Sequence, residues 1–195
     1  MKAHPSALID PGAKIAEDVE IGPFSSVGAG VTIGAGCRLG AHVMLQGPDV
    51  LIGRNNVFHP HSKVSAPDRG RIEIGDDNVF REYSHIDGPK PGSVTRVGSR
   101  NRFGVCVAFC AGCSIGNDVL LGAYALLAES CVVEDEARLE AAVVIGNEEP
   151  RRVGRGSRVR SMVPLEADVP PGRIMDWDLE QLVPYARDIR SVLEG

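Results

Sequence analysis

The sequence predicts an all-β fold: a left-handed parallel β-helix built from hexapeptide repeats, with a short C-terminal helical cap. The main observation is a period of six, which fits neither an amphipathic helix nor a simple strand. Every sixth residue from 97 to 145 is apolar, and a glycine often follows it. The composition agrees, because only 5% of the residues are aromatic while there are 23 glycines. A narrow coil interior packs aliphatic side chains and cysteines rather than aromatic rings.

The apolar repeat runs through most of the chain and predicts where the coils lie. It begins with the positions Ile15, Ile21, Val27, Ile33, Leu39 and Leu45. The segments 65–71, 87–96 and 147–152 break the period, and each is predicted to be a loop. We therefore expect a β-helix domain over residues 1–171 with these three loops. Residues 172–195 are expected to form a short helical segment that caps the last coil.

A second inward position in each hexad carries small, polar or sulfur-containing residues. The asparagines at this position are Asn56, Asn78 and Asn101. They are expected to form a polar ladder or to satisfy backbone groups near the loops. The cysteines at this position are Cys37, Cys113 and Cys131, which we interpret as buried packing thiols rather than a disulfide framework. Cys106 and Cys110 do not fit this position.

Charge and hydropathy argue against several classes of protein. A net charge of -5 disfavours nucleic-acid binding. The longest apolar run, residues 120–128, is well short of the roughly 20 residues that span a membrane. Residues 1–10 lack a signal-peptide pattern, so we expect a soluble, cytoplasmic protein.

Three hexads per coil imply a triangular prism whose flat faces favour a homotrimer. An ordinary sandwich with six-residue strand spacing is the less favoured alternative.

Four segments resemble one known family. They are IGDDN at 74–78 with Arg81 and Glu82 after it, VGSRN at 97–101, CSIGN at 113–117 and DVPP at 168–171. From about residue 7 to residue 171 the chain resembles the acyl-carrier-protein-dependent UDP-N-acetylglucosamine O-acyltransferases of lipid A biosynthesis. The resemblance implies trimers with sites in clefts between neighbouring prisms, where a histidine acts as general base on a sugar hydroxyl. It also implies an acyl carrier protein and a sugar nucleotide as partners, with no cofactor.

The chain departs from this family at the catalytic positions. The family's general base falls on Ala111, and the aspartate that follows it falls on Gly112. Three further family histidines fall on Ala108, Asp87 and Ser130. Alanine cannot take a proton from a hydroxyl. The resemblance therefore implies the fold. Acyl transfer by this chain would need a different residue as the base, or the activity has been lost.

Other ionisable residues are candidates for a substitute site. His85 assisted by Asp87 is the preferred base, with His59 next. If Phe58, Phe80 and Phe103 share a face, then His59, Arg81 and Cys106 should stack in successive coils, with Cys110 beyond the His85 corner. The candidate substrate-binding residues are Asp68, Arg81, Cys106, Cys110 and Ala111. Asp68 is included because the resemblance implies a loop acid that contacts the sugar. Surface polar residues around a trimer interface are the alternative interpretation.

Three functions remain open. The first is acyl transfer from a carrier-protein thioester to a sugar nucleotide or another acceptor. The second is a catalytically inactive binding or structural homologue. The third is a repurposed enzyme acting on an acyl thioester. No metal is expected; the less favoured alternative is a zinc site formed by His59 and His61 with His85 of a neighbouring chain. The basic run at 151–160 favours contact with a phosphate or an acidic carrier protein, and a solvated surface is the alternative.

Overall fold

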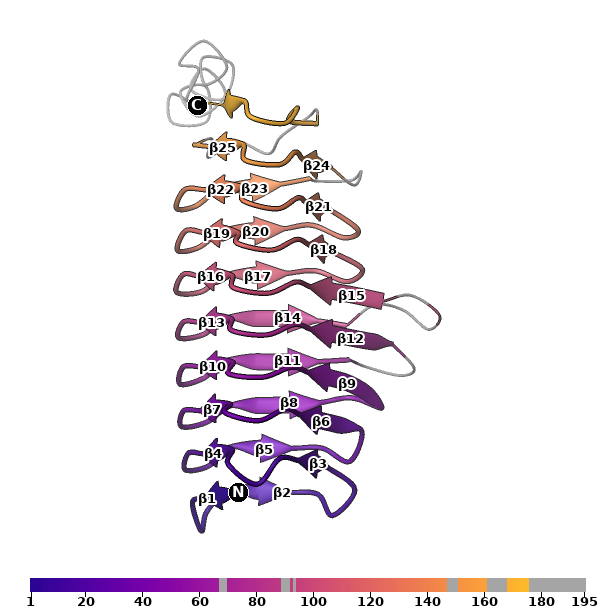
Figure 1. Ribbon diagram of the computed structural model, residues 1–195, viewed down its shortest axis with the longest axis vertical. Coiled ribbons are helices and arrows are strands. Elements are labelled where there is room, and N and C mark those ends of the chain that lie inside the picture. Colours follow the sequence, from indigo (N-terminus) through magenta and orange to yellow (C-terminus); the bar gives the residue numbers. More distant parts are fainter. Residues whose placement is uncertain (67–69, 89–91, 93, 147–150, 161–167, 176–195) are drawn as a thin grey trace, which may run out of the picture.

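The computed structural model describes residues 1–66, 70–88, 92, 94–146, 151–160 and 168–175. These residues form three parallel sheets that run along the faces of one long prism (Figure 1). From β1 to β25 each strand pairs with the strand three positions away in the chain, so one coil contributes one strand to each sheet. This arrangement confirms the parallel β-helix and excludes a sandwich. The described residues contain no helix.

The strands are short, as six-residue repeats require. Sheet A contains β1 (Lys2–Ala3), β4 (Glu20–Ile21), β7 (Arg38–Leu39), β10 (Val57–Phe58), β13 (Val79–Phe80), β16 (Arg102–Phe103), β19 (Leu120–Leu121), β22 (Arg138–Leu139), β25 (Arg158–Val159) and β26 (Ile174–Met175). Sheet B contains β2 (Leu8–Ile9), β5 (Ser26–Val27), β8 (Met44–Gln46), β11 (Lys63–Ser65), β14 (His85–Asp87), β17 (Ala108–Phe109), β20 (Leu126–Leu127) and β23 (Val144–Ile145). Sheet C contains β3 (Lys14–Ile15), β6 (Val31–Ile33), β9 (Asp49–Ile52), β12 (Arg71–Ile74), β15 (Val94–Val97), β18 (Ser114–Ile115), β21 (Val132–Val133) and β24 (Arg152–Val153).

The core is a set of columns, each made of one inward position repeated from coil to coil. Phe58 and Phe80 stack with ring centroids 4.6 Å apart, and Phe80 and Phe103 follow at 4.8 Å. The three predicted packing cysteines are fully buried at the small inward positions. Strand register is therefore fixed by burial, because a shift of one residue would turn every apolar side chain outward.

The buried asparagines form the ladder expected from the sequence. Asn78 Nδ2 donates to Asn56 Oδ1 at 3.0 Å and to the Gly98 carbonyl at 2.9 Å. Asn78 Oδ1 accepts a hydrogen bond from the Asn101 amide at 2.9 Å. Each asparagine thus satisfies backbone groups at a corner where the chain turns away from the regular strand ladder.

Glycine recurs after the aliphatic position because the next coil passes very close there. A Cβ atom built on Gly75 would lie 2.8 Å from the Gly98 carbonyl oxygen and 2.5 Å from Ser99 Oγ. Real Cβ atoms do not approach backbone so closely, so this position requires glycine.

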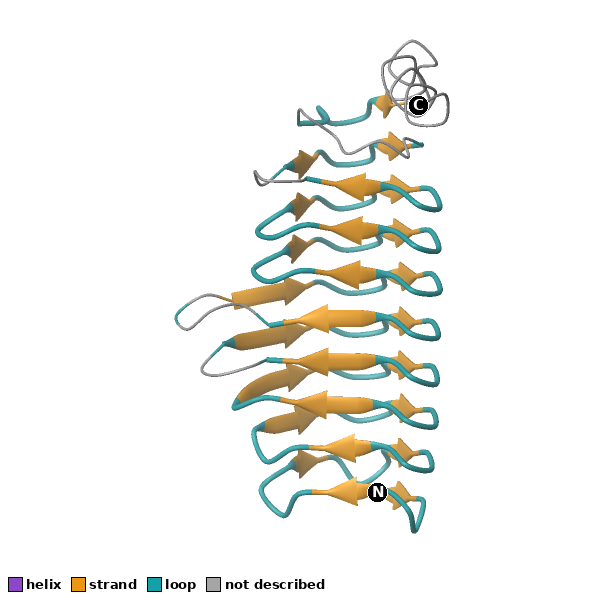
Figure 2. Cartoon of the chain, turned by 180° about the vertical axis from the view of Figure 1, so that it is seen from behind, coloured by secondary structure: helices purple, strands orange, loops and turns teal. Residues whose placement is uncertain are grey.

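The connections from β11 to β12 and from β14 to β15 each join sheet B to sheet C, whose strands Figure 2 shows from behind. They are shorter than the sequence predicted, because Ser65, Asp87 and the residues from Val94 onward still pair as strands. At the other end, β26 pairs with β25 beyond Pro171, where the sequence analysis ended the coil. Residues 172–195 were expected to be helical, but Ile174–Met175 form strand β26 instead, and residues 176–195 lie outside the described residues.

Candidate functional site

The corner between sheets B and C holds the preferred pair of candidate catalytic residues. His85 and Asp87 lie two residues apart on β14, so both side chains point outward from the same face. His85 Nε2 lies 2.9 Å from Asp87 Oδ1. The contact is close but poorly aligned for a hydrogen bond, and the Nε2 atom itself is shielded from solvent. The side chains are 38% and 50% exposed, respectively, which leaves the rest of the imidazole accessible.

The next coil places three other candidates beside this pair. Ala108 on β17 is the register partner of His85. Cys110 follows β17, and burial together with the neighbouring Asp87 carboxylate raises the pKa of its thiol. A thiol with a raised pKa is mostly protonated at neutral pH, so it is a poor nucleophile. Ala111 lies on the same turn and its carbonyl accepts a hydrogen bond from the Ser130 amide.

A buried threonine holds this turn against the preceding coil. Thr95 Oγ1 accepts a hydrogen bond from the Gly112 amide at 2.9 Å and donates to the Asp87 carbonyl at 3.3 Å. The backbone that carries Asp87 is therefore tied to the Cys110–Cys113 turn. Asp68, the candidate loop acid, lies outside the described residues.

The corner between sheets A and B carries a second ionisable cluster. His59 Nδ1 lies 3.3 Å from Glu82 Oε1, and Arg81 Nε donates to Glu82 Oε2 at 3.0 Å. Hydrogen bonds from its own backbone amide and from Arg81 lower the pKa of the Glu82 carboxyl. Sequence reasoning missed Glu82 as a site residue, because it lies 23 positions from His59 and only the coil geometry brings the two together.

The predicted stack of His59, Arg81 and Cys106 is only partly present. The His59 amide bonds to the Phe80 carbonyl and the Arg81 amide to the Phe103 carbonyl, so His59 and Arg81 do share one column. The next residue of that column is Gly104. Cys106 belongs to a neighbouring column, because its amide bonds to the Glu82 carbonyl at 2.9 Å. The sequence placed it wrongly because His59 and Arg81 directly follow Phe58 and Phe80, whereas Cys106 stands three residues after Phe103.

His59 and His61 do not form a chelating pair. His61 instead stacks between the rings of His42 and Tyr83, with centroids 4.9 Å and 4.8 Å away. Within the described ranges, no group of three or more His, Cys, Asp or Glu side chains is placed to hold a metal ion.

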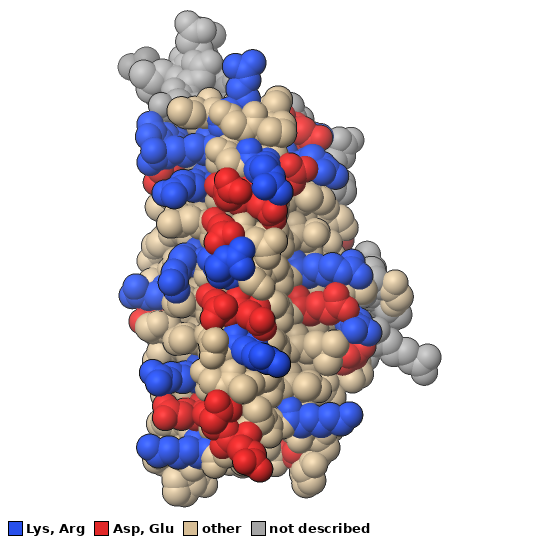
Figure 3. Space-filling model, in the orientation of Figure 1, with Lys and Arg blue, Asp and Glu red and all other residues tan. Residues whose placement is uncertain are grey.

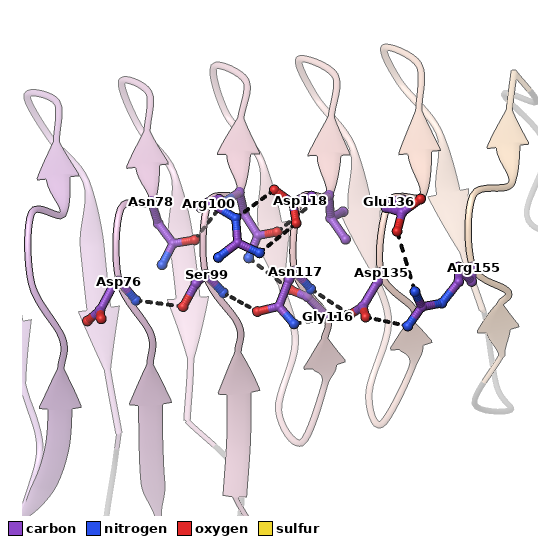
Figure 4. Close-up of polar contacts among 12 residues, drawn as sticks. Asp76, Asn78, Ser99, Arg100, Gly116, Asn117, Asp118, Asp135, Glu136 and Arg155 are labelled. Atoms are coloured by element: carbon purple, nitrogen blue, oxygen red, sulfur yellow. Dashed lines mark hydrogen bonds and ion pairs between the residues drawn. The ribbon is translucent and has the colours of Figure 1, made fainter.

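The corner between sheets C and A is polar and structural. The Asp76 amide donates to Ser99 Oγ at 2.9 Å, and the Ser99 amide donates to Asn117 Oδ1 at 2.8 Å (Figure 4). The Asn117 amide in turn donates to Asp135 Oδ1 at 2.8 Å. Each side chain accepts a hydrogen bond from a backbone amide of the preceding coil, so these polar side chains already have hydrogen-bond partners.

The basic run on the last coils is largely paired with carboxylates. Arg152 Nη1 lies 2.6 Å from Glu134 Oε1, and Arg155 Nη2 lies 2.7 Å from Asp135 Oδ2. Arg158 Nε donates to Glu140 at 2.8 Å. On the face seen in Figure 3, acidic and basic side chains alternate along the prism. This pairing favours the solvated-surface interpretation of these three arginines.

The described part of the chain includes no helix with the length and apolar character needed to cross a membrane.

Comparisons with known proteins point in one direction. Residues 12–47 match the family described as bacterial transferase hexapeptide (six repeats). The chain is 40% identical over 145 residues to the acyl-[acyl-carrier-protein]–UDP-N-acetylglucosamine O-acyltransferase of Thiobacillus denitrificans, which covers 70% of this chain and 56% of that enzyme. The enzyme of the same name from Xanthomonas euvesicatoria is 57% identical over 61 residues, or 31% of this chain and 23% of that enzyme. The chain thus spans little more than half the length of the first and less of the second.

Solved structures agree with these relatives. LpxA from Acinetobacter baumannii superposes with a TM-score of 0.85 at 26% identity, covering 90% of this chain and 71% of that one. The UDP-N-acetylglucosamine acyltransferase of Francisella novicida superposes with a TM-score of 0.83 at 27% identity, covering 94% and 73%. Both the repeat and the overall path of the coils are therefore shared with these proteins.

Proposed function

We propose that this chain, which belongs to the hexapeptide-repeat β-helix family that includes the UDP-N-acetylglucosamine O-acyltransferases, transfers an acyl group from a carrier-protein thioester to a hydroxyl of an acceptor. A sugar nucleotide is the proposed acceptor and a homotrimer the proposed assembly, with the acceptor held in a cleft between copies. The observation that carries the proposal is the His85–Asp87 pair, which faces outward on β14 of sheet B.

His85 has the arrangement that a general base needs. With Asp87 next to Nε2, the favoured neutral tautomer carries its proton on Nε2 and leaves Nδ1 free to accept one. Nδ1 would take the proton of the acceptor hydroxyl as its oxygen attacks the thioester carbonyl. The carbon–sulfur bond then breaks, and the carrier leaves as a thiolate that recovers this proton. Asp87 would stabilise the imidazolium in between, since such contacts tighten when substrate binds.

A binding protein without catalytic activity is the second candidate function. It is favoured by alanine at positions 108 and 111, where the family resemblance implies histidines. A repurposed enzyme that alters the thioester without acylating a sugar is the third candidate, and it shares the same observation.

The test is an acyl-transfer assay with UDP-N-acetylglucosamine and a panel of acyl carrier thioesters, followed by mass spectrometry of both substrates. We expect an acylated sugar nucleotide from the wild type and at least a hundredfold slower turnover from His85→Ala. Asp87→Asn should also slow turnover, while His4→Ala at the exposed N-terminus serves as the matched control. Altered thioester without acylated sugar would support the repurposed enzyme. Unchanged substrates would contradict the proposal and favour the binding protein.

The Ala111 position offers an independent variant. If the remaining cleft still accepts the family's substrates, Ala111→His should increase the rate of sugar acylation. An increase in Ala111→His combined with no effect of His85→Ala would show that His85 is not the base.

A further inference from the structure

A column of equivalent turn residues runs along the corner between sheets A and B. We call it the corner column; its members are Phe24, His42, His61, Tyr83, Cys106, Tyr124 and Ala142. All have a positive φ between 56° and 64°. The amides of Tyr83, Cys106 and Tyr124 each bond to a carbonyl of the coil before, at 3.2, 2.9 and 2.8 Å. With the same backbone geometry in each coil, the Cα–Cβ bonds of the column point the same way.

The first four members form a continuous stack of rings. Phe24 and His42 have centroids 5.1 Å apart, followed by 4.9 Å between His42 and His61 and 4.8 Å between His61 and Tyr83. The last two pairs are parallel to within 4°. The ring spacing equals the rise of one coil, about 4.8 Å. The rings therefore lie across the long axis of the prism, and the free face of Tyr83 points toward the next coil.

The stack of rings ends at Tyr83, and the column holds one more aromatic residue before Ala142. Cys106 occupies the next position with a short side chain, and Tyr124 stands one coil further on. The backbones that carry Tyr83 and Tyr124 are thus two coils apart, about 9.6 Å. Tyr83 is 57% exposed and Tyr124 is 64% exposed, so the gap above Cys106 opens to solvent.

We propose that the Tyr83–Cys106–Tyr124 gap binds one planar aromatic ring that carries an anionic group. A ring at the level of Cys106 would lie about 4.8 Å from each tyrosine, the spacing at which the other rings of the column already stack. One ring fills the gap, because each flanking tyrosine offers one face to it. Bulkier, non-planar groups would not fit between two rings that are two coils apart, about 9.6 Å.

The ligand is proposed to carry an anionic group because a positively charged residue lies on the same coil as Cys106. Arg102 begins β16, four residues before Cys106, and its side chain is exposed. No ion pair joins it to another described residue, in contrast to Arg81 and Arg100, which are held by Glu82 and Asp118. An exposed guanidinium without an ion-pair partner among the described residues favours a carboxylate or a phosphate as its ligand. The nearby Glu82 carboxylate is already compensated by Arg81, which limits its repulsion of such a ligand.

The test uses two matched probes, indole-3-carboxylate and its neutral analogue indole-3-carboxamide, titrated by ligand-observed NMR. The wild type should bind both probes and prefer the carboxylate. Cys106→Phe places a ring in the gap and should abolish binding of both probes. Cys106→Ala leaves the gap open, so this variant should still bind both probes. Arg102→Gln should remove the preference for the carboxylate while retaining the carboxamide.

Two further results make the outcome decisive. Tyr124→Ala removes one of the two flanking rings and should weaken binding of both probes by up to about tenfold. This variant still tests the proposal if Cys106→Phe does not fold. Circular dichroism would establish the fold of each variant. Equal affinities of wild type and a folded Cys106→Phe would overturn the proposal. A wild type that binds neither probe up to its solubility limit would overturn it as well.

Discussion

Asn78 shows how one buried side chain stabilises three successive coils. Its amide and carbonyl groups bond to Asn56, Gly98 and Asn101, and the residue is fully buried. In such a place, the loss of a partner leaves the remaining donor or acceptor without water to replace it.

We therefore predict that Asn78→Ala lowers the free energy of unfolding by roughly 2–5 kcal/mol, since the Asn101 amide and the Gly98 carbonyl both lose a partner. Chemical denaturation measures this difference directly. Asn55→Gly is the control, because Asn55 makes an exposed contact to Asp77 and its positive φ suits glycine. A cost for Asn78→Ala as small as that of the control would mean that the ladder does not stabilise the coils.

The cysteines differ in accessibility, and this predicts their reactivity. Burial raises the pKa of the Cys113 thiol to about 12, and it also raises the pKa values of Cys37 and Cys131. Cys106 is half-buried on the corner column. A maleimide should label Cys106 first and Cys110 more slowly, and the three buried thiols should react only in denaturant. Peptide mass spectrometry after short exposures would rank them, with Cys106→Ser as control. Early labelling of Cys113 would refute this order.

At the scale of elements, the strands were predictable and the corners were not. The hexad of Ile74, Phe80 and Ile86 predicts inward positions, because a coil core accepts only aliphatic and aromatic side chains there. The corner column was missed since His42, His61 and Tyr83 are spaced by 19 and 22 residues, and the inserted residues hide their common register. His85 and Asp87 are in contact because they lie two residues apart on one strand, and their catalytic role stays a prediction.

The three corners also differ in what they offer. The C–A corner uses its polar side chains to cap backbone amides. The A–B corner carries exposed rings, which leaves their edges and the gap at Cys106 free for contacts. The B–C corner carries the connections from β11 to β12 and from β14 to β15, and the His85–Asp87 pair. Because the coil backbone is the same throughout, function on this scaffold is decided by the outward-facing side chains rather than by the path of the chain.

At the scale of the whole molecule, exposed ion pairs join successive coils. Asp118 receives two hydrogen bonds from Arg100, at 2.9 Å and 2.7 Å, and these lower the pKa of its carboxyl. Glu134 accepts from the Arg152 side chain and the Arg155 amide, which lower its pKa in the same way. The ordinary values are 3.8 for aspartate and 4.5 for glutamate.

These shifts fix the direction of the acid dependence. A carboxyl whose pKa is lowered by folding binds its proton more readily in the unfolded chain. Its contribution to stability is therefore complete above its ordinary pKa, and it is lost as the pH falls through the pKa of the folded state. We predict a free energy of unfolding that changes little from pH 7 to about pH 5 and then declines below about pH 4.5. The double variant Asp118→Asn, Glu134→Gln should be less stable than wild type at pH 7, with a shallower decline in acid. Asparagine suits the positive φ of residue 118, so the variant tests charge rather than backbone strain. Urea denaturation at a series of pH values would measure both profiles, and parallel declines would show that other carboxyls control acid stability.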